Sequence, residues 1–305
     1  MKTLGRISCF ALLTVAALSP TWAQGSGGGL RYTIAVTDFE NQSGYAWHWD
    51  LGYAWETVMT DLLQQTGRFI VLGESDMRAA ALDEQDLGAS GRTAQGAKTP
   101  EIGQLTPAQI LVKGAITHAQ VSGGGGGGFS VKGIRIGGGK ESATINATVY
   151  VIDSTTGQVL ASKDVESTSA KRGGRLGYSG HGWSGDADAF KNDNVGKALE
   201  DGVSQAVEWI ESQLPNIPWR GSVAVVQDGS VYVNRGTREG VAPGQTFVVG
   251  SETVIRDPDT GEELDRSVER VAELRCDTVK EKLSICAVTG GDAAAVEQGM
   301  AVHLP

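Results

Sequence analysis

The stretch GAITHAQVSGGGGGGFSVKGIRIGGGKESATINATVYVIDSTTG, residues 114–157, decides how this chain is organised. A β-branched run leads into six consecutive glycines, and three more glycines follow the short alternating segment at residues 129–136. Glycine loses the most backbone entropy on ordering and is among the poorest helix formers, so this stretch does not form a helix. It is either a flexible surface loop or an extended arm that becomes ordered when something pairs with it.

The composition is that of a folded, acidic protein with room for two domains. The 305 residues are 40% hydrophobic, include seven Trp and carry a formal net charge of −10. An apolar fraction of this size supports ordinary cores. The negative charge argues against a nucleic-acid partner, because neutralising phosphates requires clustered Lys and Arg.

Residues 1–23 have the features of a secretory signal peptide. Lys2 and Arg6 precede the mostly apolar stretch Ile7–Leu18, and Thr21–Ala23 offers a small-x-small cleavage site. The alternative is an uncleaved N-terminal anchor, although the apolar stretch is short for a transmembrane helix. We therefore expect an exported protein, located at the periplasmic face of the outer membrane or in the periplasm.

Residues 24–30 form a Gly/Ser linker, and the patterns over residues 31–214 predict an α/β domain with a mixed sheet. Helices are expected to begin near Trp55, at the capping residue Ser75 and at the capping residue Asn194. Strand patterns with alternating or β-branched residues occur at residues 31–39, 68–72, 109–117, 143–152 and 159–165.

The C-terminal part has a different pattern, and residues 215–220, which contain two prolines, form the linker that precedes it. Residues 221–305 carry only short strands separated by turn signals, which predicts a small all-β barrel or sandwich. Cys276 and Cys286 flank a strand–turn–strand pattern there. In an oxidising compartment a cross-strand disulfide is the first interpretation, and two free buried thiols are the alternative.

No catalytic constellation is recognisable. The six-glycine run satisfies the dinucleotide-binding pattern trivially but opens no helix. No further Cys or His lies at metal-ligand spacing from the two C-terminal cysteines, and no acid, base and nucleophile can be assembled from motifs. We therefore expect a protein that is not an enzyme and that needs neither a cofactor nor a metal.

An aromatic segment follows the first expected strand. Tyr45, Trp47 and Trp49 occupy alternate positions, so an extended backbone would place all three on one side. They either pack under the following helix as core or form, with Tyr53, an exposed loop that contacts another chain.

Several segments in order resemble the curli production assembly/transport component (CsgG) family. They are IAVTDFENQSG at residues 34–44, RFIVL at 68–72, ILVKGAIT at 110–117, the glycine stretch, and GKALEDGVSQAVEWI at 196–210. The resemblance covers roughly residues 31–212. The segment VYVNRGTREGVAPGQTFVV, residues 231–249, looks like the small β domain of a periplasmic flagellar assembly protein.

The resemblance implies a homo-oligomeric, ring-shaped outer-membrane channel that exports or assembles a surface polypeptide. Each subunit of that family contributes two β-hairpins to a shared barrel, and a loop after the first strand narrows the pore. Carried over to this chain, the Gly-rich hairpin arms lie at about residues 116–146 and 162–190. The narrowing or partner-contact loop contains Tyr45, Trp47, Trp49 and Tyr53.

Two functions therefore stay open. The first is a non-enzymatic component of an outer-membrane or periplasmic secretion system, built like the curli export channel. The second is a soluble periplasmic interaction protein in envelope or surface-structure assembly. The second arm is polar and carries Lys171, Arg172 and Arg175, which would have to face the lumen or water.

Overall fold

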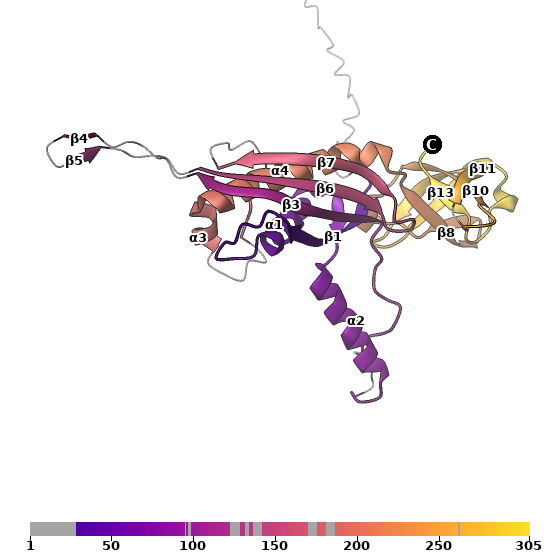
Figure 1. The fold of residues 1–305 in the computed structure, drawn as a ribbon. Helices are drawn as coiled ribbons and strands as arrows, with labels where there is room; N and C mark the ends of the chain where they lie inside the picture. The colour runs from indigo at the N-terminus through magenta and orange to yellow at the C-terminus, as the bar shows by residue number, and fades with distance from the viewer. Residues whose placement is uncertain are drawn as a thin grey trace, which may run out of the picture.

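The computed structural model describes residues 29–94, 96, 99–122, 129–131, 134–136, 142–169, 176–180, 187–261 and 263–305. A five-stranded mixed sheet with helices and a C-terminal closed barrel of six strands make up the described chain, as the sequence predicts (Figure 1). The expected signal peptide, residues 1–23, and parts of both expected arms lie outside the described residues. The exact domain boundaries stay a prediction.

The sheet has the strand order β2-β1-β3-β6-β7, in which β1 is parallel to β2 and β3 while β3, β6 and β7 run antiparallel. Helices α1 and α4 pack against the sheet and against each other, whereas α2 projects from the body (Figure 1). The elements of this part are β1 (Tyr32–Asn41), α1 (Leu51–Thr66), β2 (Phe69–Val71), α2 (Ser75–Ala89), β3 (Ile110–Ser122), β4 (Phe129–Val131), β5 (Ile134–Ile136), β6 (Ser142–Asp153), β7 (Val159–Thr168), α3 (Ala187–Asn192), α4 (Asn194–Gln213) and the 3₁₀ turn η1 (Leu214–Asn216).

Strands β3 and β6 pair over their whole length, from Ile110 opposite Asp153 to Ser122 opposite Ser142. A β-bulge between Ile116 and His118 shifts the register once. Up to Ile116 the buried residues of β3 fall at even positions, and after the bulge the buried residue is Ala119, at an odd position. The extra residue therefore keeps the same face of the strand turned toward the core. The sequence pattern ends the strand at residue 117, where the alternation breaks, but the ladder continues for five more residues.

The core between the sheet and the helices depends on close approaches at glycine. Trp55 is fully buried and stacks on Phe39 with ring centroids 5.6 Å apart. A Cβ at Gly202 of α4 would lie 2.9 Å from the Trp55 ring, so only glycine admits α4 at this distance. The distance between α1 and α4 is therefore set by the Trp55 ring, which packs directly against the backbone of Gly202.

The ends of the helices follow capping chemistry, with two corrections to the sequence interpretation. Gly67 ends α1 in the left-handed conformation, at φ 64°, as the sequence predicts. The N-cap of α4 is Asp193, whose side chain accepts from the Val195 amide, and the N-cap of α2 is Glu74. In both cases the residue expected as the cap, Asn194 or Ser75, is instead the first residue of the helix.

The C-terminal strands close into a barrel, which decides between the barrel and the sandwich. Their order around the barrel is β10-β11-β12-β9-β8-β13, and every pairing is antiparallel. Trp219 and Phe247 stack in its core with centroids 5.0 Å apart. The elements are β8 (Arg220–Gln227), β9 (Ser230–Val233), η2 (Thr237–Glu239), β10 (Thr246–Arg256), β11 (Glu263–Val279), β12 (Ser284–Gly291), η3 (Ala293–Ala295) and β13 (Ala301–His303).

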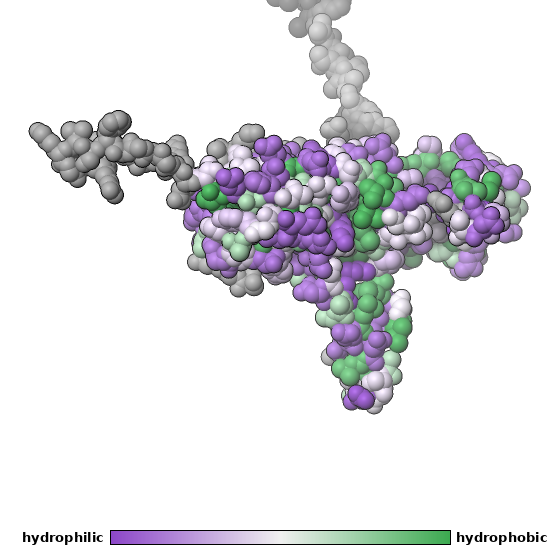
Figure 2. All heavy atoms as spheres, viewed as in Figure 1, coloured by the Kyte–Doolittle hydropathy of each residue, from purple (hydrophilic) through white to green (hydrophobic). Residues whose placement is uncertain are grey.

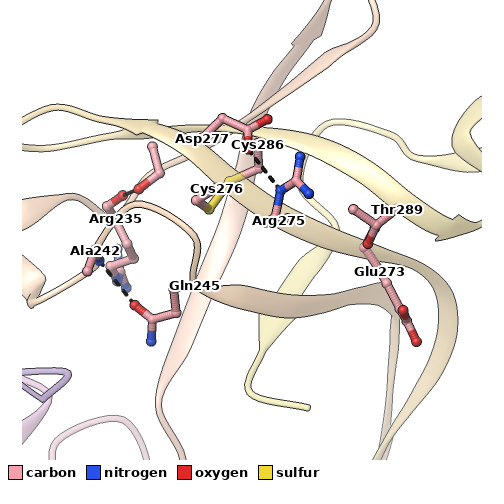
Figure 3. The surroundings of a disulfide bond; sticks show 10 residues. Arg235, Ala242, Gln245, Glu273, Arg275, Cys276, Asp277, Cys286 and Thr289 are labelled. Carbon is pink, nitrogen blue, oxygen red and sulfur yellow. Dashed lines mark hydrogen bonds and ion pairs between the residues drawn. A yellow bond between two sulfur atoms is a disulfide. The ribbon is translucent and has the colours of Figure 1, made fainter. Parts of the chain in front are cut away.

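A disulfide joins Cys276 of β11 to Cys286 of β12, which lie directly opposite each other in the ladder (Figure 3). Both cysteines are buried in the barrel core. The Arg275 Nε donates to the Asp277 carboxylate at 2.9 Å on the same strand (Figure 3). The bond therefore crosslinks two neighbouring strands inside the barrel.

Replacing Trp55 by Ala should lower the free energy of unfolding of the α/β part by about 3–5 kcal/mol, because a fully buried ring leaves a cavity that the sheet cannot fill. Denaturant unfolding followed by far-UV circular dichroism of the helices measures this change. Tyr53→Ala is the matched control, since Tyr53 lies on the same helix and is 38% exposed. A cost for Trp55→Ala no greater than that for Tyr53→Ala would contradict the packing argument.

Removing the disulfide should destabilise the barrel selectively. The bonded cysteines are 10 residues apart in sequence, and closing a loop of that length is worth about 2–3 kcal/mol in the chain-entropy model. Hydrogen exchange of a Cys276→Ala/Cys286→Ala protein should show lost protection in β8–β13 and unchanged protection in α1 and α4. Equal protection of the barrel with and without the bond would defeat this expectation.

Candidate functional site

The candidate site is the loop at residues 42–50, which joins β1 to α1. Asn41 starts it: its side-chain oxygen accepts from the Ser43 amide and hydroxyl, and its amide nitrogen donates to the Tyr45 carbonyl at 3.0 Å. Gly44 follows with φ 69°, a conformation that favours glycine. Asp50 ends the loop by accepting from the Tyr53 amide at 2.8 Å, which caps α1.

The aromatic residues of the loop alternate in exposure. Tyr45, Trp47 and Trp49 are partly buried and pack against the core, whereas Ala46 and His48 are exposed. The three rings therefore share one side of the loop. Each ring is partly buried and partly exposed to solvent. The rings of Tyr45 and Trp47 stack at 5.7 Å, which makes the loop a continuous aromatic rim.

Two residues near the start of α4 hold this rim, which we define as Tyr45, Trp47 and Trp49. The Trp47 indole N–H donates to one carboxylate oxygen of Asp193 at 2.9 Å. The other oxygen of Asp193 accepts from the Val195 amide at 3.0 Å. The Trp49 ring lies 5.1 Å from the buried ring of Phe190 in α3.

One carboxylate thus caps α4 and anchors the rim, although it lies far from the rim in sequence. The sequence gives an Asp directly before the helix, which is a capping signal, but nothing in it links that residue to Trp47. The sequence interpretation therefore found the rim and missed both of its anchors.

A shallow hollow of about 500 Å³ opens beside the rim and is lined by Asn41 and residues 44–51. Tyr53, the fourth residue expected in the contact loop, lies one turn into α1 and does not line this hollow. Its ring is partly exposed on the helix surface. The structure therefore brings together three of the four expected residues and separates the fourth.

The rim and the Gly-rich arm leave the sheet at the same end. Strand β1 is parallel to β3, with Asn41 opposite Ile116, so the loop after β1 begins where β3 extends toward the arm. The paired strands β4 and β5 lie farther out in the same direction, and the C-terminal barrel lies at the opposite end of the body (Figure 1).

The site offers aromatic surface and hydrogen-bond acceptors. In the described part of the chain, no group of three or more His, Cys, Asp or Glu side chains could hold a metal ion. None of the described helices is both long enough and apolar enough to cross a bilayer. The arrangement is suited to contact with another chain.

The family comparison identifies an assembly or transport component of the cell envelope. The family model described as "Curli production assembly/transport component CsgG" matches residues 23–243, well over half of the chain. The chain belongs to this family. The match ends inside the barrel region, and the likeness of that region to a flagellar assembly protein stays a prediction.

The solved structures that match this chain share little sequence with it and have low TM-scores. The PelC dodecamer from Paraburkholderia phytofirmans is 13% identical over 60% of this chain and 92% of its own, with a TM-score of 0.30. A hypothetical protein from Chlamydia trachomatis is 13% identical over 61% and 99%, with a TM-score of 0.36. A lipoprotein from Neisseria meningitidis is 14% identical over 61% and 99%, with a TM-score of 0.27. A search of curated proteins finds no match.

Substitutions at Asp193 should separate its two roles. Asn caps helices about as well as Asp but cannot accept from Trp47 with its amide nitrogen, so Asp193→Asn should free the rim while keeping the cap. Asp193→Ala loses both and should cost about 1 kcal/mol more in unfolding free energy. Hydrogen exchange over residues 42–50 reports the rim, and chemical denaturation reports the cap.

Trp47→Phe is the matched control, because it removes the same hydrogen bond from the other side and leaves the cap intact. It should raise exchange in the loop as much as Asp193→Asn does. If Trp47→Phe leaves the loop as protected as in the parent protein, the hydrogen bond to Asp193 does not hold the rim.

Proposed function

We propose that this chain is a subunit of a homo-oligomeric outer-membrane channel that exports or assembles a surface polypeptide. The observation that carries the proposal is the ladder between β3 and β6, which runs unbroken to Ser122 opposite Ser142 and opens into the Gly-rich segment. Two antiparallel strands that are paired in register up to their ends can continue as the two strands of a longer β-hairpin.

The length of the arm suits this role. A membrane-crossing strand needs about 9–11 residues, and residues 123–141 together with the ends of β3 and β6 provide two such strands. A single hairpin cannot span a bilayer, because its outer edges would carry unpaired backbone groups in hydrocarbon. Hairpins from several subunits that close into one barrel satisfy those groups, so the proposal requires a ring of copies.

The second arm would have to leave the body before it could insert. Residues 176–180 lie against the helices: the Ser179 amide and hydroxyl donate to Asp61 at 2.9 and 2.8 Å. The Tyr178 amide donates to Glu200 at 3.0 Å, and the Tyr178 ring is buried. We propose that the docked segment is the conformation of the subunit before it inserts into the membrane, and that insertion breaks these contacts.

The rim takes the role of the narrowing loop in this proposal. It sits at the arm end of the sheet, so a ring of subunits would place several copies of Trp47 and Trp49 around the path of an exported chain. Tryptophan gives a large contact area at low entropic cost, which suits weak contact with an extended polypeptide.

The alternative is a soluble periplasmic interaction protein. The docked position of residues 176–180 favours it, because the segment is hydrogen-bonded to Asp61 and Glu200 of the body and needs no membrane for these contacts. In that case the rim contacts a folded partner, and the Gly-rich stretch stays a loop.

Fractionation tests the two functions directly. The channel requires that the mature protein sediments with the outer membrane, needs detergent for extraction and runs as a large species on sizing. Ser122 and Ser142 lie directly opposite each other, so a two-residue Asn-Gly turn can replace residues 123–141. This variant should no longer need detergent for extraction, and the melting temperature of its C-terminal barrel should be unchanged.

A control deletion removes exposed residues elsewhere, for example residues 101–103 in the loop between α2 and β3, and should leave fractionation unchanged. Release of the parent protein by osmotic shock as a small species would refute the channel and support the soluble alternative.

A further inference from the structure

Helix α2 stands away from the body and is attached mainly at its beginning. Figure 1 shows it projecting from the sheet, and Figure 2 shows apolar and polar residues mixed over its surface. Within the helix only Gly88 is buried, and Met77, Leu82 and Leu87 are each at least 41% exposed. Its N-cap residue Glu74, by contrast, is only 4% exposed.

Two buried carboxyl groups meet at this attachment point. Glu56 of α1 is 5% exposed, and the amide of Ser75, the first residue of α2, points at its carboxylate from 3.5 Å. The Glu74 side chain makes no capping hydrogen bond. Because Glu74 is almost wholly buried, its charged form is disfavoured there.

The charged groups that act on Glu56 and Glu74 are all acidic. Burial, together with the nearby charges of Glu74, of Asp38 on β1 and of Asp76 on α2, raises the pKa of Glu56 to about 7. The Ser75 amide opposes this shift. Burial also raises the pKa of Glu74, with Asp76 as the second cause. No cation is among the groups that act on either acid.

Tyr178, in the loop at residues 176–180, is a further titratable group on which Glu74 acts. Burial raises the pKa of the Tyr178 hydroxyl, and Asp61, Tyr53 and Glu74 add to the effect. This phenol stays neutral across the range in which carboxyl groups titrate, so it supplies no charge that could stabilise ionised Glu74.

We propose that Glu56 and Glu74 form a protonation-dependent latch that holds the start of α2 against α1 when the two carboxyl groups are protonated and releases it when both are ionised. When α2 is docked, the carboxyl groups have raised pKa values and keep their protons. When α2 is released, the solvated carboxyl groups lose these protons at their ordinary, lower pKa values. Docking is therefore complete at acidic pH and weakens as the pH rises through the window between the ordinary value and about 7.

Release would free a projecting helix whose outer side is acidic and carries exposed apolar residues. Asp83, Glu84 and Asp86 are all exposed there beside Leu82 and Leu87. The orientation of α2, and with it the position of this surface, would then depend on the pH of the compartment. The latch lies on α1 and is independent of whether the Gly-rich arm enters a membrane.

Hydrogen exchange of the full mature chain tests the latch. After correction for the intrinsic exchange rate, protection of the amides in the first two turns of α2 should fall about tenfold or more between about pH 5.5 and about pH 8. Amides of α4 serve as the internal reference and should keep their protection. Spin labels at Leu87→Cys and Val159→Cys, both exposed sites, should show a broader distance distribution at the higher pH.

Isosteric variants separate the latch from general loosening. Glu56→Gln and Glu74→Gln cannot ionise, so each should remove most of the pH dependence and keep α2 protected at about pH 8. Asp83→Asn makes the same chemical change on the exposed side of α2 and should leave the pH dependence as in the parent. Equal protection of α2 at both pH values in the parent, or an unchanged pH dependence in both Gln variants, would overturn the proposal.

Discussion

The ladder between β3 and β6 is the interaction on which the rest of the structure depends. These are the central antiparallel pair of the sheet, and each carries a neighbour that could not hold its place alone: β1 pairs with β3, and β7 pairs with β6. Buried residues recur on one side of β6 from Ala143 to Val151, which fixes the register because a slip by one residue would turn every one of them outward. The bulge after Ile116 lets β3 follow this register to the arm.

Much of this fold is readable from the sequence, because its signals are local. The alternation in RYTIAVTDF and ATINATVYVI, the helical stripe of α4, the prolines after it and the turn signals of the barrel each depend on residues close together in the chain. Two turn signals prove right for the same reason: Gly67 ends α1, and the residues after Asp153 close the β6–β7 turn, where Asp153 accepts from the Thr155 and Thr156 amides.

The rest depends on contacts between distant residues, which no local pattern records. A bulge looks like the end of a strand, because alternation stops at Thr117 although pairing does not. The anchor of Trp47 is Asp193, which a sequence can mark as a helix cap but not as a partner of the rim. The burial of Tyr178 in a Gly-rich, polar stretch is likewise set by the helices it meets, not by its neighbours in sequence.

Both proposals about moving parts meet on the same side of α1. That helix is buried on nearly all sides, yet one side carries Glu56 and Asp61, and the hydroxyls of Thr57 and Thr60 are buried without partners in the described structure. The start of α2 covers Glu56, and Ser179 covers Asp61.

Removing either cover would expose acids and hydroxyls, which water solvates well, while the apolar side of α1 stays against the sheet. Lifting residues 176–180 would in addition break the contact between the buried Tyr178 ring and Phe190. Undocking a segment from an apolar core would cost much free energy. Undocking a segment from polar groups changes the free energy little, because water replaces the hydrogen bonds that are lost. The polarity of this one helix side therefore explains why two segments at different places in the chain can be stably docked in one condition and released in another.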